Sequence, residues 1–255
     1  MNYSSAASTV SLADVASLPF LQGVDPDIIR ELASSAHMMQ QPKGAVFLPQ
    51  GAQVSRFYVV MEGWCGACKG NMDGQETLLQ IFRRGDFLLE AGQNVAEEYS
   101  PFNMQALTRI QILSLSLASV RNAIERSETL KDNLLAATVR RCNELRDRIE
   151  QLALHSAERR VGRFLLQMRM VSGGNGNEIV LPFDKSMIAS YLGIKPETFS
   201  RALLVFKNKG FKVGRSHLAI PHEHALCEYC DSISMQACPF AKNTVCACVL
   251  MKQAG

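Results

Sequence analysis

The segment from residue 184 to residue 209 reads DKSMIASYLGIKPETFSRALLVFKNK, and its spacing predicts two short helices joined by a tight turn. Ile188 and Leu192 lie four residues apart and give the first helix an apolar face. Asp184 can cap the N-terminus of that helix, because its carboxylate can accept a backbone N–H of the first turn. Gly193 permits the turn, and two helices joined in this way form a helix-turn-helix.

The second helix begins at Pro196, which suits the first turn because the N–H that proline lacks would have no acceptor there. Apolar residues at helical spacing predict its buried face, namely Phe199, Leu203, Leu204 and Phe206. Glu197, Ser200 and Arg201 stand at i, i+3 and i+4 and form one exposed cluster near the N-terminus. Recognition helices contact base edges at that end, where arginine suits guanine and glutamate can accept from cytosine. The alternative is an ordinary ion pair on a solvated helix face.

Two short strands are predicted after this helix, over residues 211–213 and 217–220, with a turn between them. This pattern is typical of the wing of a winged helix. Between residues 156 and 224 the chain has 11 Lys and Arg and five Asp and Glu, so the local net charge of +6 exceeds the +3 of the whole chain. Phosphate contacts need such an excess, and double-stranded DNA is therefore the expected partner.

The motif Glu-Thr-x-Ser-Arg, formed by Glu197, Thr198, Ser200 and Arg201, resembles the recognition helix of the CRP/FNR family of bacterial transcription regulators, closest to its FNR/DNR branch. The resemblance implies that these residues bind DNA and read a TTGAT-type palindrome, and that RNA polymerase is a partner. The cAMP-type branch carries Arg-Glu-Thr-x-Gly-Arg, from which Pro196 and Ser200 depart. The resemblance runs from about residue 19 to residue 221.

The expected fold is α+β, with an N-terminal cyclic-nucleotide-binding-like β-roll, a long dimerisation helix and a C-terminal winged helix-turn-helix. Helical and β-rich patterns along the chain agree with this order. The predicted divisions are a flexible arm (1–17), a sensory β-roll domain (18–126), the dimerisation helix (127–154), the DNA-binding domain (155–224) and a cysteine-rich tail (225–255).

The β-roll departs from cyclic-nucleotide binders where those proteins hold the phosphate. They follow a Gly-Asp pair with Arg-Ser or Arg-Thr, whereas the sequence from Gly85 to Thr108 contains no Lys or Arg and four acidic residues. A phosphate without a cationic partner is poorly held, so we expect no cAMP binding. On a strand of this roll, Cys65 and Cys68 should point to opposite faces, with one thiol buried and the other exposed.

The long helix carries a seam whose residues step by three and four, as in a two-stranded coiled coil. We expect these residues to form a homodimer interface: Leu135, Thr138, Cys142, Leu145, Ile149 and Leu152. The alternative is a core stripe within one domain. Two-fold pairing would place two recognition helices one DNA turn apart, ~34 Å.

Five of the eight cysteines lie in the last 29 residues. Intracellular thiols stay reduced, so this crowding indicates metal or redox chemistry, and the candidate metal ligands are Cys227, Cys230, Cys238 and Cys246. The tail resembles the FNR cluster box, C-x2-C-x5-C with the words SIS and PF, but has two extra residues before the third cysteine. A [4Fe-4S] cluster, zinc, haem and a tail of free thiols without a cofactor all remain open, as does the identity of the fourth ligand.

Composition excludes other classes of protein. No apolar run approaches the ~20 residues that span a bilayer, and the N-terminus lacks a charged region followed by an apolar one, so we expect a cytoplasmic protein without membrane contact. No Ser-His-Asp, His-x-Glu or phosphate-loop constellation is found, so no enzyme is expected. The expected function is redox-, oxygen- or nitric-oxide-responsive DNA binding; the alternative is a cyclic-nucleotide-type regulatory module acting on a protein partner.

Overall fold

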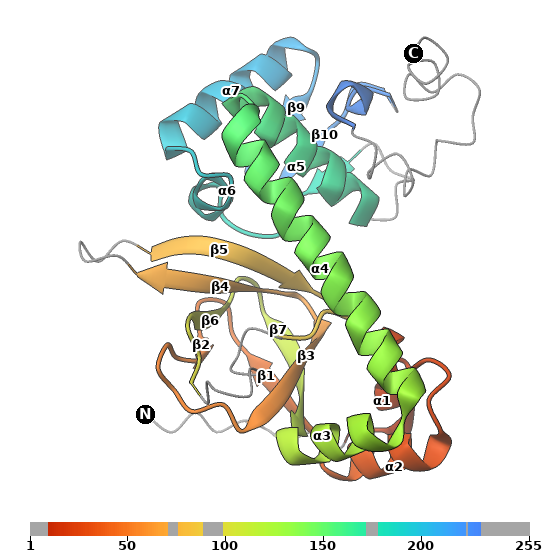
Figure 1. Cartoon of the computed structure of the whole chain (residues 1–255). Helices are drawn as coiled ribbons and strands as arrows, with labels where there is room; N and C mark the ends of the chain where they lie inside the picture. The colour runs from red at the N-terminus through yellow and green to blue at the C-terminus, as the bar shows by residue number, and fades with distance from the viewer. Residues whose placement is uncertain (1–9, 71–75, 89–98, 172–177, 223, 231–255) are drawn as a thin grey trace. The chain divides into compact units, whose positions relative to one another are not determined.

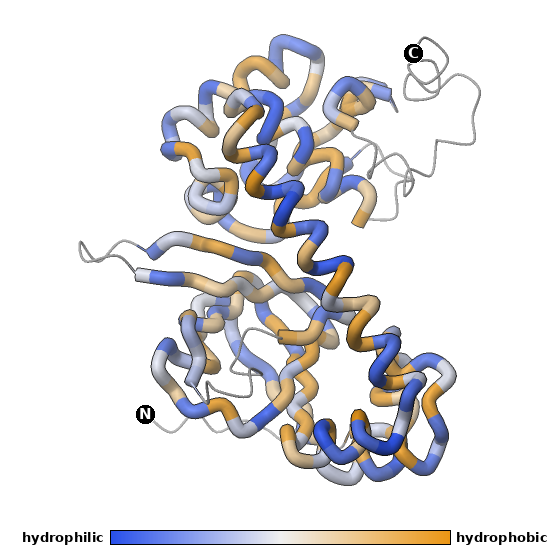
Figure 2. Tube along the Cα trace, viewed as in Figure 1, coloured by the Kyte–Doolittle hydropathy of each residue, from blue (hydrophilic) through white to orange (hydrophobic). Residues whose placement is uncertain are grey.

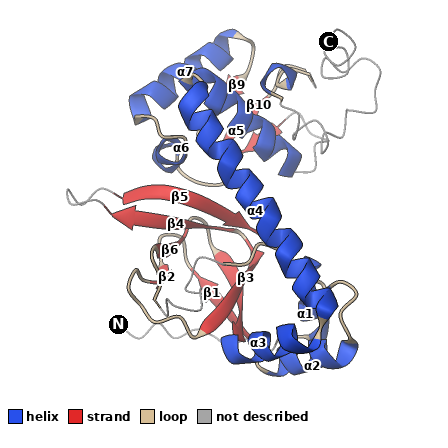
Figure 3. Cartoon of the chain, viewed as in Figure 1, coloured by secondary structure: helices blue, strands red, loops and turns tan. Residues whose placement is uncertain are grey.

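The computed structural model describes residues 10–70, 76–88, 99–171, 178–222 and 224–230 of the 255-residue chain. These residues form two compact units, divided between Arg146 and Asp147, a point that lies inside the longest helix (Figure 1). Strands and helices occur in both units, which confirms the predicted α+β class (Figure 3).

The first unit contains the β-roll, built from two antiparallel sheets with strand orders β1-β7-β3 and β2-β6-β4-β5. Apolar side chains from both sheets form one buried cluster, which includes Val60, Phe82, Met104 and Ile112. The strands are β1 (His37–Gln41), β2 (Val46–Leu48), β3 (Arg56–Glu62), β4 (Trp64–Gly70), β5 (Glu76–Arg83), β6 (Asn103–Ala106) and β7 (Ile110–Ser116).

Gly63 forms the connection between β3 and β4 and has a φ of 79°, a conformation that residues with a Cβ rarely adopt. A Cβ at this position would also lie within 3.0 Å of the Arg109 carbonyl oxygen and of Thr108. The Trp64 N–H, just after this turn, donates to Thr108 Oγ1 at 2.9 Å. The turn therefore requires glycine for both its backbone conformation and its closeness to the neighbouring loop.

Four helical segments pack against the roll through a second apolar cluster: α1 (Leu12–Ala16), η1 (Pro19–Leu21), α2 (Pro26–Ser34) and α3 (Leu117–Arg126). Helix α1 lies inside the predicted flexible arm, so that prediction is corrected for this helix. Ser11 and Asp14 form a reciprocal capping box, which satisfies backbone donors at the N-terminus of the helix. Val15 is fully buried in the second cluster, and its burial fixes the segment.

Both cysteines of β4 are buried, so the expected exposed thiol is not found. Cys65 belongs to the cluster between the sheets, whereas Cys68 Sγ donates to Gln105 Oε1 at 3.7 Å. Leu78 of β5 pairs directly with Cys68 and is itself buried, which covers this part of the strand. Burial raises the pKa of Cys65 far above its usual value and raises that of Cys68 to about 11.

Helix α4 (Glu128–Leu154) is the long helix expected over residues 127–154. Ser127 separates α4 from α3. Its Oγ accepts from the Leu130 N–H at 3.1 Å, as the side chain of an N-cap residue does. Figure 2 shows apolar and polar residues alternating along this helix. Only Leu130 is a buried residue of α4, so most of its apolar side chains are partly or fully open in the single chain.

The second unit is a small helical domain with a three-stranded antiparallel sheet in the order β8-β10-β9. Strands β9 and β10 form the predicted wing around the turn at residues 214–216. Phe164, Phe199 and Phe206 are fully buried and form the centre of the domain. Its elements are α5 (Ala157–Val171), β8 (Glu178–Val180), α6 (Lys185–Tyr191), α7 (Pro196–Asn208), β9 (Lys212–Val213), β10 (His217–Ala219) and η2 (Cys227–Tyr229).

Candidate nucleic-acid interface

Helix α7 begins at Pro196 as predicted, with Lys195 in extended conformation at the N-cap position. Phe199, Leu203 and Phe206 are buried and fix the helix to its domain. Burying each of these side chains stabilises the domain by about 1.5–3 kcal/mol. This anchoring holds the opposite face of α7 in a defined orientation.

The exposed face of α7 carries Glu197, Ser200 and Arg201, whose side chains all face solvent, and Thr198 beside them is partly buried. The Ser200 Oγ donates to the Pro196 carbonyl at 3.0 Å. Since that bond uses the hydroxyl hydrogen, Ser200 presents an acceptor to a neighbouring molecule. The structure therefore brings the predicted contact residues together on one open surface at the N-terminal end of the helix.

The prediction that Leu204 is buried is wrong, because Leu204 is 58% exposed. It lies three positions after Arg201 and four after Ser200, so helical geometry puts it on their face. The error came from assigning two consecutive leucines to one face. Leu203 alone enters the core.

The turn between α6 and α7 is fixed by two arginines of the same unit. Arg148 Nη2 donates to the Tyr191 carbonyl at 2.7 Å, and Arg160 Nη1 donates to the Leu192 carbonyl at 2.8 Å. Both acceptors are carbonyls at the C-terminal end of α6, which lack partners within a helix. Gly193 follows with a φ of 62°, as the predicted turn requires.

Asp184 occupies the N-cap position of α6, as predicted, but its side chain makes no capping hydrogen bond, so that part of the prediction is wrong. Lys185 instead connects the start of α6 to the wing, because its Nζ donates to the Gly214 carbonyl at 3.1 Å. The wing turn is thus tied to the helix-turn-helix by a contact that no local pattern in the sequence indicates.

The positive charge of this unit is only partly available to a ligand. Arg163 and Arg169 are 5% exposed, and burial lowers the pKa of Arg163. Arg148 and Arg160 bind backbone carbonyls as described above. Apart from Lys209, whose ammonium is paired with Glu158 and Glu228, the exposed cations close to α7 in the sequence are Lys195, Arg201, Lys207, Lys212 and Arg215. These five residues, on α7 and the wing, are the ones that can approach phosphates.

Comparison with known proteins agrees with this geometry. Residues 39–127 match the cyclic nucleotide-binding domain, and residues 159–229 match the Crp-like helix-turn-helix domain. The chain belongs to the CRP/FNR family of transcription regulators. As in that family, its function is DNA binding and transcription regulation rather than enzymatic catalysis, which confirms two of the predictions.

Several CRP/FNR proteins are similar over most of the chain. The nitrogen fixation regulation protein FixK of Bradyrhizobium diazoefficiens is 25% identical over 73% of this chain and 78% of its own length. The cAMP-activated global regulator CRP of Escherichia coli O6:H1 is 21% identical over 69% of this chain and 85% of its own. The solved structure of FixK2 from Bradyrhizobium japonicum has a TM-score of 0.68 at 20% identity, covering 77% of this chain and 98% of that one.

CRP/FNR regulators are typically dimeric, and α4 has an exposed apolar face suited to pairing. Leu135 is 62% and Ile149 is 68% exposed, and Leu152 and Cys142 are also exposed. The two remaining seam residues, Thr138 and Leu145, are partly buried. Exposed Val139 lies next to Thr138 and was missed, although its spacing of four from Leu135 was a usable signal.

The described part of the cysteine tail is a single 3₁₀ turn, η2. Cys227 is 7% exposed and Cys230 is partly exposed, and the Cys230 N–H donates to the Cys227 carbonyl at 3.0 Å. Cys227 Sγ lies 3.9 Å from His224 Nδ1. Cys238 and Cys246 lie outside the described residues. Within the described ranges, no group of three or more His, Cys, Asp or Glu side chains is arranged to hold a metal ion.

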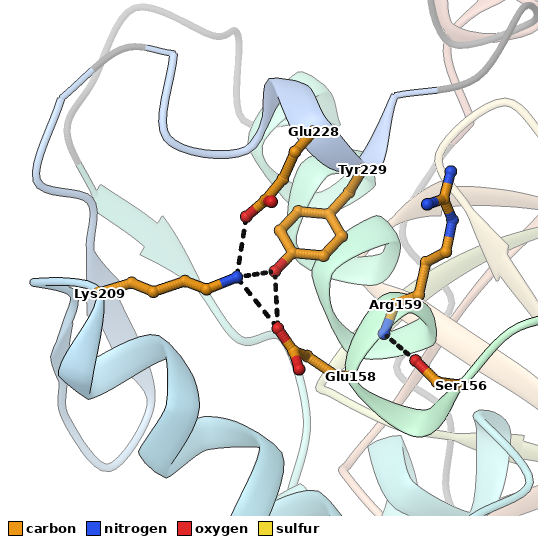
Figure 4. A network of polar contacts seen from close by, with 6 residues as sticks. All are labelled: Ser156, Glu158, Arg159, Lys209, Glu228 and Tyr229. Carbon is orange, nitrogen blue, oxygen red and sulfur yellow. Dashed lines mark hydrogen bonds and ion pairs between the residues drawn. The ribbon is translucent and has the colours of Figure 1, made fainter.

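The turn η2 is anchored to α5 and to the end of α7 by polar contacts (Figure 4). Lys209 Nζ donates to Glu158 Oε1 at 3.0 Å, to Glu228 Oε1 at 2.9 Å and to the Tyr229 hydroxyl at 2.8 Å. The Tyr229 hydroxyl in turn donates to Glu158 Oε1 at 3.2 Å. The start of α5 is capped nearby, where Ser156 Oγ accepts from the Arg159 N–H at 3.3 Å.

These contacts set the charge states of the network. The hydrogen bond with Tyr229 is the main cause that raises the pKa of Lys209, and burial raises the pKa of Tyr229 to about 12. The hydrogen bond from Lys209 lowers the pKa of Glu228. Near neutral pH the Lys209 ammonium therefore contacts the neutral phenol of Tyr229 and the carboxylate of Glu228. No local pattern in the sequence indicates this network, because its partners lie up to 71 residues apart.

Among the described residues, no helix is both long enough and apolar enough to cross a membrane.

Proposed function

We propose that this CRP/FNR regulator acts as a homodimer that reads a TTGAT-type palindrome through Glu197, Thr198, Ser200 and Arg201. It then controls transcription through RNA polymerase, in response to oxygen, nitric oxide or redox state. The observation that carries the DNA-reading part is the open polar cluster at the N-terminal end of α7, held by the buried Phe199 beneath it. FixK, one of the similar proteins, is named as a regulator of nitrogen fixation.

The first test is a binding measurement with two inverted TTGAT half-sites centred about ten base pairs apart, one turn of DNA. Arg201→Ala should weaken binding by about 1–3 kcal/mol per half-site and remove discrimination at one guanine. Arg30→Ala, which removes an exposed arginine of α2 paired with Asp27, is the matched control and should leave binding unchanged. An unaltered sequence preference in Arg201→Ala would remove this residue from base reading.

Homodimer formation is supported by the apolar residues that α4 leaves exposed. Ile149→Glu places a charge in the proposed seam and should convert the dimer to monomer in light scattering. Leu154→Glu is the control, because Leu154 is 74% exposed on the same helix but lies outside the seam spacing. Equal molar masses for the two variants would contradict the seam.

The proposed metal site at the tail cysteines is supported by the geometry of η2. Cys227 and Cys230 are three residues apart, and the Cys230 N–H donates to the Cys227 carbonyl, which supports a proposal in which both thiolates bind one centre. Thiolates suit iron and zinc, and the nearby His224 suits zinc, so the described residues fit two ligands of such a site. Cys238 and Cys246 would supply the others. A bound iron-sulfur cluster would provide oxygen-sensitive chemistry, and zinc would provide a structural cross-link.

Metal content and colour of protein purified without air test this site. Cys227→Ser should lower the bound iron or zinc to less than half, whereas Cys142→Ser, a change on α4, should leave it intact. Visible absorbance that bleaches in air would identify an iron-sulfur cluster. Stoichiometric zinc in colourless protein would identify the alternative metal, and a metal-free preparation would reject the site.

The absence of Lys and Arg between Gly85 and Thr108 supports a regulator that does not respond to cAMP. Titration calorimetry with cAMP should show no heat of binding. Micromolar affinity would overturn this part of the proposal.

A further inference from the structure

The end of the recognition helix is joined directly to the turn that carries the two described tail cysteines. Lys209 is the C-cap residue of α7, and its ammonium contacts both Glu228 and Tyr229 of η2. Tyr229 is the residue just before Cys230 and two after Cys227. The turn is therefore in direct contact with the C-cap residue of the recognition helix.

Apolar contacts seat the same turn in the domain. The Tyr229 ring lies 5.4 Å from the Phe206 ring of α7, and both residues are buried. Leu226, just before η2, is fully buried. On α5, a Cβ at Gly162 would lie within 3.0 Å of three atoms of the Tyr229 ring, so the ring rests directly on that glycine.

Backbone hydrogen bonds within the turn connect the two cysteines to Tyr229. Cys227 N–H donates to the His224 carbonyl at 3.0 Å, and Tyr229 N–H donates to the Leu226 carbonyl at 3.1 Å. A shift of either cysteine therefore changes the position of the Tyr229 side chain. Cys227 is nearly buried in this arrangement, so withdrawal of its sulfur toward a ligand outside the turn would disturb the packing of Tyr229.

We propose that Glu158, Lys209 and Tyr229 form a latch that couples the Cys227–Cys230 turn to the recognition helix. In the closed latch the C-terminal end of α7 is fixed and Cys227 is shielded. Opening the latch exposes Cys227 and weakens DNA binding, because α7 loses one of its anchors. This inference rests on the proposed function, in which α7 reads DNA and the cysteine turn receives the signal.

The coupling has a measurable consequence that needs no metal. Coupling between two sites is reciprocal, so DNA that favours the closed latch must also protect Cys227 from reaction. In the metal-free full-length protein, palindromic DNA should slow the alkylation of Cys227 by iodoacetamide at least ~5-fold, as couplings of ordinary size do. Mass spectrometry of the peptide that contains Cys227 separates it from the other thiols.

Two lysine variants isolate the latch from the general charge of the helix. Lys209→Met should weaken DNA binding at least ~5-fold and abolish the protection of Cys227. Lys207→Met removes an equal charge from an exposed position of α7 outside the network. It should weaken DNA binding through the loss of a phosphate contact, but at saturating DNA it should keep the protection of Cys227. If both variants lose the protection, or both keep it, the latch is rejected.

A steric variant provides a second route that leaves every polar group of the network in place. Gly162→Ala should displace the Tyr229 ring and increase the alkylation rate of Cys227 in the absence of DNA about tenfold, which corresponds to a change of ~1.4 kcal/mol in the free energy of opening. In a Tyr229→Ala background the added methyl group meets no ring, so it should have no further effect. Additive effects of the two changes would contradict the latch.

Failure of the latch and failure of the proposed function give different results. If Arg201→Ala leaves DNA binding intact, α7 is not the reading helix, and the latch is rejected with the DNA-reading proposal. If Arg201→Ala weakens binding but DNA does not protect Cys227, the reading helix stands and the latch alone is rejected.

Discussion

Single residues decide what this domain presents to a ligand and what it hides. The open face of α7 joins Glu197, Ser200 and Arg201, while Arg163 and Arg169 of α5 are buried despite their charge. Local spacing predicts the first group, because helical geometry alone sets which residues share a face. It cannot predict the second, because burial depends on segments distant in the sequence.

The three cysteines outside the tail should differ sharply in reactivity. Cys65 and Cys68 are buried with raised pKa values, so both are protonated near neutral pH, whereas Cys142 is exposed on α4. In the monomeric Ile149→Glu variant, iodoacetamide should modify Cys142 alone among these three, as read by peptide mass spectrometry, because the proposed seam would cover Cys142 in the homodimer. Unfolding in urea should make all three equally reactive. Rapid native modification of Cys68 would show that the cover provided by Leu78 is incomplete.

Asp86 should make the first unit less stable as pH rises. Burial raises its pKa above the usual 3.8, although a hydrogen bond from the Arg83 N–H and the charge of Arg141 oppose the shift. The folded state then binds the proton more tightly than the unfolded state, so the free energy of unfolding falls as pH rises from 3.8 through the folded pKa. Asp86→Asn should lack this fall in urea unfolding, whereas the exposed Asp132→Asn should retain it.

At the scale of elements, the helix-turn-helix is held by side chains from elsewhere in its unit. Local signals in the sequence predicted three elements. Apolar spacing predicted α6, Pro196 marked the start of α7, and the turn before His217 indicated the wing. It did not predict that arginines of α4 and α5 bind the end of α6. Helix α1 was also missed, although Ser11 and Asp14 have the spacing of a capping box.

Loss of the carbonyl contact at the end of α6 should destabilise the DNA-binding domain. Arg160→Met keeps an apolar stem but removes the donor to the Leu192 carbonyl. We expect a loss of about 1–3 kcal/mol in the free energy of unfolding, measured with urea, because the carbonyl is left without this partner. Arg159→Met, a change at an exposed neighbouring position, should cost less than 0.5 kcal/mol, roughly the range for surface sites. Equal losses would show that α6 does not depend on this bond.

For the whole homodimer, the salt dependence of DNA binding reports the number of phosphate contacts, including those made by the two wings. Lys212 is exposed on β9 and belongs to the cations available to DNA. If each copy contacts one phosphate, Lys212→Gln should reduce the slope of log K against log salt by about 2 for the homodimer. The sequence preference should not change. A slope equal to that of the wild type would place Lys212 outside the interface.

The buried contact of Gly162 with Tyr229 should make the residues at these two positions correlated among related sequences. Because there is no room for a side chain beneath the aromatic ring, the two positions cannot vary independently during evolution. Relatives with tyrosine at the position of Tyr229 should have glycine at the position of Gly162 on α5. Relatives with alanine or a larger residue at the position of Gly162 should have a side chain smaller than tyrosine at the position of Tyr229. This correlation would separate relatives that retain the packing of tyrosine on glycine from relatives that have lost it.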